Sequence, residues 1–172
     1  MKIAECSFQQ APEILAIFNE AIATSTALYD YQPRTMANME AWFAAKRSGK
    51  HPVVGGFDDD DRLTGFASYG TFRAWPAYKY SVEHSVYVKK ENRGQGLGKR
   101  LLGEIVEAAQ KQEYHTIIGV IDSANETSIQ LHQSAGFTLC ANIKQAGYKF
   151  GRWLDVVYYQ LILPTPAHPT EG

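Results

Sequence analysis

Three glycines at every second position form the most unusual stretch of this sequence. They lie in "RGQGLG", residues 93–98, with Arg93 before them and Lys99 and Arg100 after them. Glycine permits positive φ angles and lets a ligand approach the backbone closely. A helix that begins here would direct free amides and the positive end of its dipole to the same place. The combination favours a phosphate or pyrophosphate ligand with basic side chains at its rim; a glycine-rich turn before a solvated basic helix is the alternative.

Two common phosphate-binding loops do not fit these letters. A Rossmann fingerprint requires GxGxxG and an acidic residue at the end of a second strand, whereas this stretch is GxGxG after the charged "KKEN". A P-loop requires four residues between its glycines and then Gly-Lys-Ser/Thr, whereas three residues separate Gly94 from Gly98, and Lys99 precedes Arg100. The loop therefore belongs to neither class.

The glycine loop is expected to connect a strand to a helix. A period of two over residues 81–88, "SVEHSVYV", predicts a central strand. Apolar residues at intervals of three to five predict a helix over residues 97–112. One face of the strand carries Val82, His84, Val86 and Val88, and the other carries Glu83, Ser85 and Tyr87.

The rest of the chain also alternates between strands and helices. Alternating or continuous β-branched runs predict strands, and apolar residues at helical spacing predict helices. The expected strands cover residues 2–6, 52–57, 63–69, 116–121, 137–141 and 154–163, and the expected helices cover residues 12–22, 38–47 and 125–136. The order predicts an α+β fold: a mixed, mostly antiparallel sheet of about seven strands flanked by about four helices.

The composition is that of one ordinary globular domain. The 172 residues are 45% hydrophobic and 20% charged, which is enough for a core. We expect a single domain over residues 1–163 and a flexible tail over residues 164–172, which contains three prolines. Lysine plus arginine (17) nearly balances aspartate plus glutamate (18), which argues against nucleic-acid and anionic-membrane partners. No apolar run is long enough for a signal peptide or a membrane span.

Cysteine and histidine form no recognisable redox or metal motif. Cys6 and Cys140 are far apart and belong to no CxxC or Cys/His cluster, so we expect neither a disulfide framework nor a zinc site, and a cytoplasmic location. The five histidines show no HxH or HExxH spacing, so no metal is expected.

The loop and a downstream segment together resemble a known superfamily. An Arg-Gly-x-Gly-x-Gly turn between a strand ending in "VYV" and an amphipathic helix resembles the acetyl-CoA pyrophosphate loop of the GNAT N-acetyltransferases. "NETSIQLHQSAGF" resembles their Asn-x-x-Ala-x-x-Leu-Tyr-x-x-x-Gly-Phe signature through Asn125, Leu131, Gly136 and Phe137. "VEHSVYV", "LHQSAGF" and "AGYKFGRWLDV" resemble the phosphinothricin and methionine sulfoximine acetyltransferase branch. The resemblance covers residues 1–163.

This resemblance implies acetyl-CoA as the co-substrate and assigns residues to it. The main chain of residues 86–88 would pair with the pantetheine arm, and residues 93–98 would cradle the pyrophosphate. Two polar residues would contact the cofactor near its thiol and arm. The implied set is Val86, Tyr87, Val88, Arg93, Gly94, Gln95, Gly96, Leu97, Gly98, Asn125 and Ser134.

Acetyl transfer to an amine requires a base, and Glu83 is the candidate. It lies mid-strand, where glutamate has poor propensity, one step along the same face from the segment implied to pair with the cofactor. It could take the proton of an α-amino group, whose pKa is about 8 in peptides, directly or through a water molecule. A glutamate on a solvated sheet face or in a structural ion pair is the alternative.

His132 is the main departure from the superfamily pattern, which often has tyrosine there. It could protonate the departing thiolate, or it could be a helix histidine bonded to a carbonyl group. Thiols have a pKa of about 8.5, so a general acid helps only moderately. His84, on the opposite strand face from Glu83, is expected to line either the core or the substrate pocket.

Two loops that join aromatic to basic residues are candidates for the acceptor site: "TFRAWPAYKY" (71–80) and "AGYKFGRWLD" (146–155). Arg73 or Arg152 could pair with the carboxylate of a zwitterionic amino acid. The resemblance implies a substrate site of Arg73, Ala74, Trp75, Glu83, His84 and Ser85. A surface loop with stacked aromatics at a dimer contact is the alternative.

The leading hypothesis is an acetyl-CoA-dependent N-acetyltransferase for a small amino acid or analogue, such as methionine sulfone, methionine sulfoximine or phosphinothricin. One alternative is a CoA-binding sensor without turnover, and another is an acetyltransferase for a peptide or polyamine. The branch that the sequence resembles is typically dimeric, so a homodimer is expected by analogy.

Overall fold

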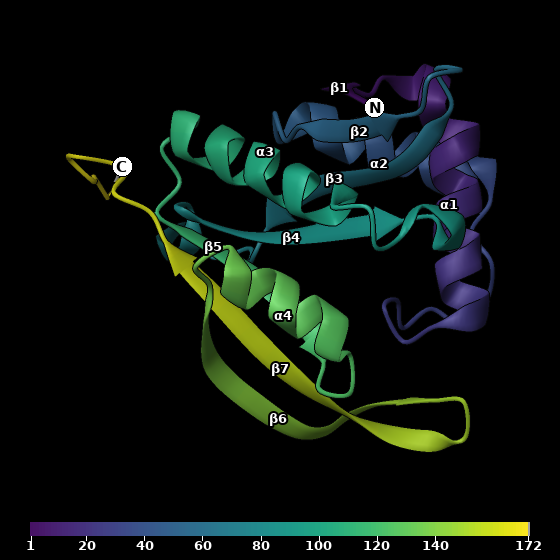
Figure 1. Cartoon of the computed structure of the whole chain (residues 1–172). Helices are drawn as coiled ribbons and strands as arrows, with labels where there is room; N and C mark the ends of the chain where they lie inside the picture. Colours follow the sequence, from purple (N-terminus) through teal and green to yellow (C-terminus); the bar gives the residue numbers. More distant parts are fainter. Residues whose placement is uncertain (172) are drawn as a thin grey trace.

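A seven-stranded sheet runs through the whole molecule (Figure 1). The computed structural model describes residues 1–171. The strands are β1 (Lys2–Glu5), β2 (Val53–Phe57), β3 (Leu63–Thr71), β4 (Ser81–Val88), β5 (Thr116–Asp122), β6 (Thr138–Lys149) and β7 (Arg152–Ile162). The helices are α1 (Ala11–Thr24), α2 (Met36–Ser48), α3 (Leu97–Lys111) and α4 (Glu126–Ser134). The predicted α+β fold, with its seven strands and four helices, is confirmed.

The order of strands in the sheet is β1-β2-β3-β4-β5-β7-β6. Within residues 1–171, β4 and β5 are the only neighbours that pair in parallel; all the others are antiparallel. A parallel pair requires a long crossover connection. The chain supplies it with the glycine loop and α3, which therefore begin at the end of β4.

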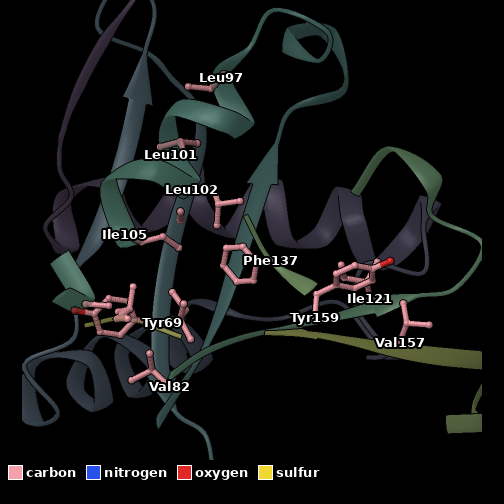
Figure 2. Close-up of a cluster of buried hydrophobic side chains, with 14 residues drawn as sticks. Tyr69, Val82, Leu97, Leu101, Leu102, Ile105, Ile121, Phe137, Val157 and Tyr159 are labelled. Carbon is pink, nitrogen blue, oxygen red and sulfur yellow. The ribbon is translucent and has the colours of Figure 1, made fainter. Parts of the chain in front are cut away.

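The two faces of the sheet carry separate apolar cores. α3 and α4 cover one face, and α1 and α2 cover the other (Figure 1). Figure 2 shows how Leu101, Leu102 and Ile105 of α3 lie over Val82 of β4 and beside Phe137. On the other face, Phe18 of α1 packs in a T-shaped arrangement on Phe66 of β3, with ring centroids 5.0 Å apart. Helices therefore pack against both faces of the sheet.

Local sequence signals explain where α1 and α2 begin. A short 3₁₀ turn at Phe8–Gln10 precedes α1, and Pro12 occupies the first helical turn, where its missing N–H costs no helical hydrogen bond. Thr35 caps α2, because its hydroxyl accepts from Asn38 N at 3.3 Å while Asn38 Oδ1 accepts from Thr35 N at 2.8 Å. The segment between the two helices, residues 25–35, is left free to line a cavity.

The C-terminal hairpin differs from the expectation. The strand expected over residues 137–141 continues to Lys149, and "AGYKFGRWLD" is not a loop but the end of a long β6–β7 hairpin. Phe150 and Gly151 form its two-residue turn with φ of 51° and 73°, the conformation that such tight turns require. β6 is an exposed edge strand with irregular register, so it lacks the alternating burial that identifies strands from sequence.

The C-terminal segment has no helix or strand but contacts the domain. The Thr165 hydroxyl donates to Tyr114 O at 2.6 Å, and Thr170 N donates to the Tyr80 hydroxyl at 3.0 Å. The expected tail covers residues 164–172, of which residue 172 lies outside the described part of the chain. Among the helices of residues 1–171, none is long and apolar enough to cross a membrane.

Candidate active site

The sheet opens between β4 and β5. The two strands pair as far as His84 and Gly119 and then diverge, although β4 continues to Val88 and β5 to Asp122 (Figure 1). β3 pairs with the other edge of β4. The edge of β4 beyond His84 therefore has main-chain groups without a strand partner, and such an edge can pair with an extended ligand.

A cavity of about 670 Å³ occupies this opening. Its walls come from β4, β5, the glycine loop, the first turns of α4 and the residues after α1. The predicted site residues that line it are Glu83, His84, Ser85, Val86, Tyr87, Val88, Arg93, Gly94, Gly96, Leu97, Gly98, Asn125 and His132. Ligand pockets commonly measure ~300–1,000 Å³, so the cavity has the size of one.

The glycine loop leaves the N-terminus of α3 accessible. Gly94 and Gly96 have φ of 76° and 79°, in the left-handed region that residues with a Cβ disfavour. A Cβ at either position would meet no atom of the described chain within 4 Å, so the space beside the loop is open. A hydrogen bond from Arg100 N to Gly96 O at 3.2 Å begins the helical ladder. The earlier amides of α3 are therefore free to bind an anion.

Gly98 does not have the positive φ expected of it. It lies in the first turn of α3, and its conformation is helical. A Cβ there would lie 3.5 Å from Leu131 Cδ2 and 3.9 Å from Val88 Cγ2, which are ordinary contacts. The absence of a side chain at Gly98 therefore widens the cavity between α3 and α4 rather than relieving backbone strain.

Basic side chains surround the loop. Arg93 Nε donates to Val88 O at 3.0 Å, and Arg93 Nη2 lies 3.9 Å from Glu20 Oε1 of α1. These contacts tie the loop to β4 and to α1. Lys99 and Arg100 are exposed in the first turn of α3 and add positive charge where its dipole is also positive.

Glu83 lines the cavity and is half-buried. Burial raises the pKa of its carboxyl group above the ordinary value, and the positive charge of Arg73 opposes part of this rise. A carboxylate with a raised pKa is a better match for the proton of an ammonium group. Glu83 is therefore suited to accept a proton inside the cavity.

His84 and His132 form a buried pair at the inner end of the cavity. His132 Nδ1 donates to Ser128 O at 2.6 Å, since a carbonyl can only accept, and the two Nε2 atoms lie 3.1 Å apart. Burial lowers the pKa of both rings, that of His84 to about 3, so both are neutral. His132 Nε2 then accepts from His84 Nε2, and His84 Nδ1 is left without a partner among residues 1–171.

Gly119 of β5 leaves room for the two histidine rings because it has no side chain. A Cβ at Gly119 would lie 2.7 Å from His132 Nε2 and 2.9 Å from His84 Nε2, so any side chain there would displace one ring. The same residues 1–171 contain no group of three or more His, Cys, Asp or Glu side chains placed to hold a metal ion.

The β6–β7 hairpin holds the segment that follows α1 against the cavity. The buried Lys149 ammonium donates to Ile22 O of α1 at 2.7 Å, and to Ser25 O at 2.9 Å and Leu28 O at 2.6 Å in that segment. The Tyr31 hydroxyl donates to Tyr148 O at 2.6 Å. A lysine at the C-terminus of a helix satisfies its last carbonyls and opposes its dipole. The position of this cavity wall therefore depends on the hairpin.

Some predicted residues lie outside the cavity. Neither Gln95 nor Ser134 lines it: the Gln95 side-chain amide donates to Glu91 O at 3.4 Å, and the Ser134 hydroxyl donates to Leu131 O at 2.8 Å. Arg73, Ala74 and Trp75 are exposed, Trp75 to 72%. Of these three residues, only Arg73 affects Glu83: its positive charge lowers the pKa of the Glu83 carboxyl group.

Other cavity residues were not foreseen from the sequence. Leu28 and Tyr29 reach the cavity from the segment after α1, and nothing in their local sequence indicates this. Asp122 ends β5, and its carboxylate accepts from Ala124 N at 3.0 Å and lies 3.6 Å from Arg152 Nη2. A buried acidic residue at the end of an apolar strand is a signal that could have identified it.

Comparison with known proteins agrees with this geometry. The model of the acetyltransferase (GNAT) domain family matches residues 9–158. The L-methionine sulfoximine/L-methionine sulfone acetyltransferase of Pseudomonas paraeruginosa is 40% identical, over 97% of this chain and 98% of that protein. A solved structure from Acinetobacter baylyi ADP1 is 53% identical, with a TM-score of 0.98 over 99% of this chain and 96% of the other.

A further solved structure shows the same fold with the co-substrate bound. The GNAT superfamily phosphinothricin acetyltransferase of Sinorhizobium meliloti in complex with AcCoA is 34% identical, with a TM-score of 0.95. The match covers 99% of this chain and 94% of the Sinorhizobium meliloti chain. The family match spans most of the chain, and the sheet opens where the family signature residues lie. The chain belongs to the GNAT acetyltransferases.

Proposed function

We propose that this protein transfers an acetyl group from acetyl-CoA to the α-amino group of a small amino acid or analogue, of the methionine sulfone, methionine sulfoximine or phosphinothricin type. The observation that carries the proposal is that one cavity contains both a half-buried carboxylate, Glu83 of β4, and an open anion site at the start of α3. The names of similar enzymes support the class of acceptor.

The residues present fit acetyl-CoA. The free amides of α3 and the open space beside Gly94 and Gly96 would hold the pyrophosphate, with Arg93 and Lys99 at the rim. The unpaired edge of β4 at residues 86–88 would pair with the pantetheine amides. Asn125 already caps α4, since its Oδ1 accepts from Ser128 N at 3.1 Å, so its amide nitrogen is left for the ligand. When bound, acetyl-CoA supplies an activated thioester.

The transfer requires two proton movements. Glu83 takes a proton from the acceptor ammonium, directly or through water, and the amine nitrogen then forms a bond to the acetyl carbon. A backbone amide at the edge of β4 stabilises the charge that develops on the carbonyl oxygen. The carbon–sulfur bond breaks, the nitrogen releases its second proton to water, and the sulfur leaves as a thiolate, which is acceptable because thiol pKa values are about 8.5.

We assign His132 a minor part in protonating this thiolate. It lines the cavity, but its Nε2 accepts from His84 and holds no proton in the neutral pair. Donation requires the imidazolium form, which burial disfavours because it lowers the pKa of His132. Water can protonate the thiolate instead. We keep Arg73, Ala74 and Trp75 in the proposed acceptor site, at the outer end near Glu83, with Arg73 facing the α-carboxylate.

A panel of acceptors tests the proposal. Release of free thiol from acetyl-CoA should occur with methionine sulfone, methionine sulfoximine or phosphinothricin, and not with peptides, polyamines or aminoglycosides. Mass spectrometry of the product should show one acetyl group on the α-nitrogen. Binding of acetyl-CoA without release for any acceptor would instead indicate a CoA-binding module.

We also propose a homodimer that works in the cytoplasm. The edge strand β6 and its hairpin expose large apolar side chains, namely Leu139, Ile143, Tyr148, Phe150 and Trp153. Such an exposed edge is usually covered in solution. The two free cysteines, buried Cys6 and exposed Cys140, suit a reducing compartment. Sedimentation equilibrium should give twice the mass of one chain, and a Leu139→Lys variant should reduce it toward one chain.

A further inference from the structure

A second cavity lies on the face of the sheet that α1 and α2 cover. Its volume is about 460 Å³. Leu28, Ser85 and Tyr87 line both this cavity and the larger one. The two cavities therefore adjoin each other at the part of β4 that follows Glu83.

Tyr87 connects the base to the second cavity. Burial raises the pKa of its phenol to about 12, so the hydroxyl stays protonated. The charges of Glu83 and Arg34 both act on this hydroxyl. Because Ser85 and Tyr87 line both cavities, an acceptor with its amine at Glu83 can extend past them into the second cavity.

The walls of the second cavity are aromatic. Phe18, Trp42 and Phe66 line it, and their rings pack in T-shaped contacts with centroids 5.0 to 6.1 Å apart. Such walls accept methylene and methyl groups and exclude water. A short aliphatic stem fits them.

Two cations lie in the same cavity, and one of them has no counter-ion. Arg34 stacks on Phe18 at 4.1 Å and pairs with Asp30, with Nε and Nη2 each 2.9 Å from Oδ2. Lys46 Nζ donates to Tyr69 O at 2.6 Å and lies 5.1 Å from the centre of the Trp42 ring, but forms no ion pair in the described chain. Asp30 therefore balances Arg34, and the Lys46 charge is left for a ligand.

Burial confirms that Lys46 is not simply a solvated surface lysine. Burial lowers its pKa to about 8, because an ammonium group away from water is destabilised unless an anion or dipole replaces the water. An ammonium group has three N–H donors, of which Tyr69 O uses one. The remaining two can bind oxygen atoms inside an apolar cavity.

We propose that this cavity receives the side chain of the acceptor amino acid, and that Lys46, assisted by Arg34, binds the oxygen atoms at its end. The inference rests on the proposed function and specifies it: the preferred acceptor has a two-carbon stem, a polar centre carrying oxygen, and a terminal methyl group. Sulfone, sulfoximine and phosphinate centres all satisfy this description. A thioether, which lacks the oxygen atoms, does not.

An isosteric series of acceptors tests the role of Lys46. Methionine, methionine sulfone and phosphinothricin share one carbon skeleton and carry a thioether, a neutral sulfone and an anionic phosphinate at the same position. Lys46→Met removes the charge but keeps the aliphatic stem. Its kcat/KM should fall by about tenfold or more for phosphinothricin, by less for the sulfone and by less than about threefold for methionine, mainly through KM.

Two further variants control for folding and for general charge. Arg47 is an exposed neighbour on α2, so Arg47→Met should leave the whole series unchanged. Lys46→Arg keeps the cation and should restore a large part of the selectivity. Equal losses of kcat/KM for all three acceptors in Lys46→Met would overturn the inference, because a purely structural role affects them alike.

Binding measured without turnover separates this inference from the proposed function. Calorimetric titration of phosphinothricin into the parent protein and into Lys46→Met should show affinity about tenfold weaker in the variant. Affinity that is the same in both proteins, or no binding to the parent, would overturn the inference. Tight binding to the parent with no thiol release from acetyl-CoA would contradict the proposed transfer and leave the binding site in place.

Discussion

In the proposed reaction, Glu83 removes the proton of the acceptor amine. Its carboxyl lies in the cavity beside the unpaired edge of β4, and burial raises its pKa while the charge of Arg73 partly offsets the rise. The carboxylate is thus a better proton acceptor than an exposed glutamate would be.

Glu83→Gln should therefore lower kcat/KM by about 100-fold at neutral pH, within the range usual for a general base. The loss should shrink as the pH rises toward the pKa of the acceptor amine, because the amine is then already unprotonated. Glu91→Gln, an exposed residue before the glycine loop, provides the matched control and should change little. A variant profile parallel to that of the parent at every pH would exclude Glu83 as the base.

The buried histidine pair predicts a pH-dependent stability. Burial lowers the pKa of His84 to about 3 and also lowers that of His132. Below the ordinary histidine pKa of about 6.5, the unfolded chain binds protons that the folded chain does not. The free energy of unfolding should therefore fall with decreasing pH, by up to about 1.4 kcal/mol per pH unit for each buried ring.

Urea unfolding at pH 7.5 and 5.0 measures this slope. His84→Gln removes one of the two titrations, so its slope should be smaller than that of the parent even if its stability is lower throughout. His168 is exposed in the C-terminal segment, and His168→Gln should keep the parent slope. Equal slopes for the parent and His84→Gln would show that His84 is not the group responsible.

At the scale of elements, the β6–β7 hairpin acts as a clamp on the segment after α1. Lys149 reaches from the hairpin to one carbonyl in the last turns of α1 and to two in that segment, and it is itself only 4% exposed. The segment it holds supplies Leu28 to both cavities. The acceptor and co-substrate sites therefore share a wall whose position is set by a strand far away in the sequence.

Lys149→Met should lower the free energy of unfolding by about 2 kcal/mol, since it leaves buried carbonyls without donors, and should raise KM for the acceptor. Lys149→Arg keeps donors in place and should recover part of both effects. On the same strand, Lys144 forms a largely exposed ion pair with Asp155 at 2.9 Å, so Lys144→Met should cost less than about 1 kcal/mol. Chemical unfolding together with steady-state kinetics checks both expectations.

The elements that were predictable from sequence are those with one buried face. β4 was predicted at residues 81–88 and occurs there, because its alternation reflects a core on one side. The end of α4 before Gly136 was predicted for a similarly local reason, since Gly136 has a φ of 87°. The length of β6 was missed, because an exposed edge strand has no such alternation.

The second cavity could not be predicted from local sequence patterns either. Arg34 lies between two helices and Lys46 near the end of α2, where a basic residue usually only complements the helix dipole. Tertiary packing brings Lys46 to Tyr69 of β3 and brings the charge of Arg34 close to Tyr87 of β4. The glycine loop was identifiable because Gly94 and Gly96 adopt positive φ angles, a conformation that glycine in the sequence indicates directly.

For the whole molecule, the narrow junction between β4 and β5 divides the sheet into two parts. Four residue pairs, from Ser81 with Thr116 to His84 with Gly119, join the first four strands to the last three. The co-substrate cavity has walls on both sides of this junction, in the glycine loop and in α4. A ligand that contacts both walls adds connections that the backbone alone does not supply.

Coenzyme A should therefore stabilise the junction more than the outer strands. Its binding raises the free energy of unfolding by about 2.7 kcal/mol at a hundredfold excess over Kd, and hydrogen exchange should slow most in residues 84–88 and 119–122. Gly96→Val forces a β-branched residue to a φ of 79° and projects it into the space beside the loop. This variant should lose both the stabilisation and the added protection, and uniform protection across the sheet in the parent would mean that the ligand does not bridge the two parts.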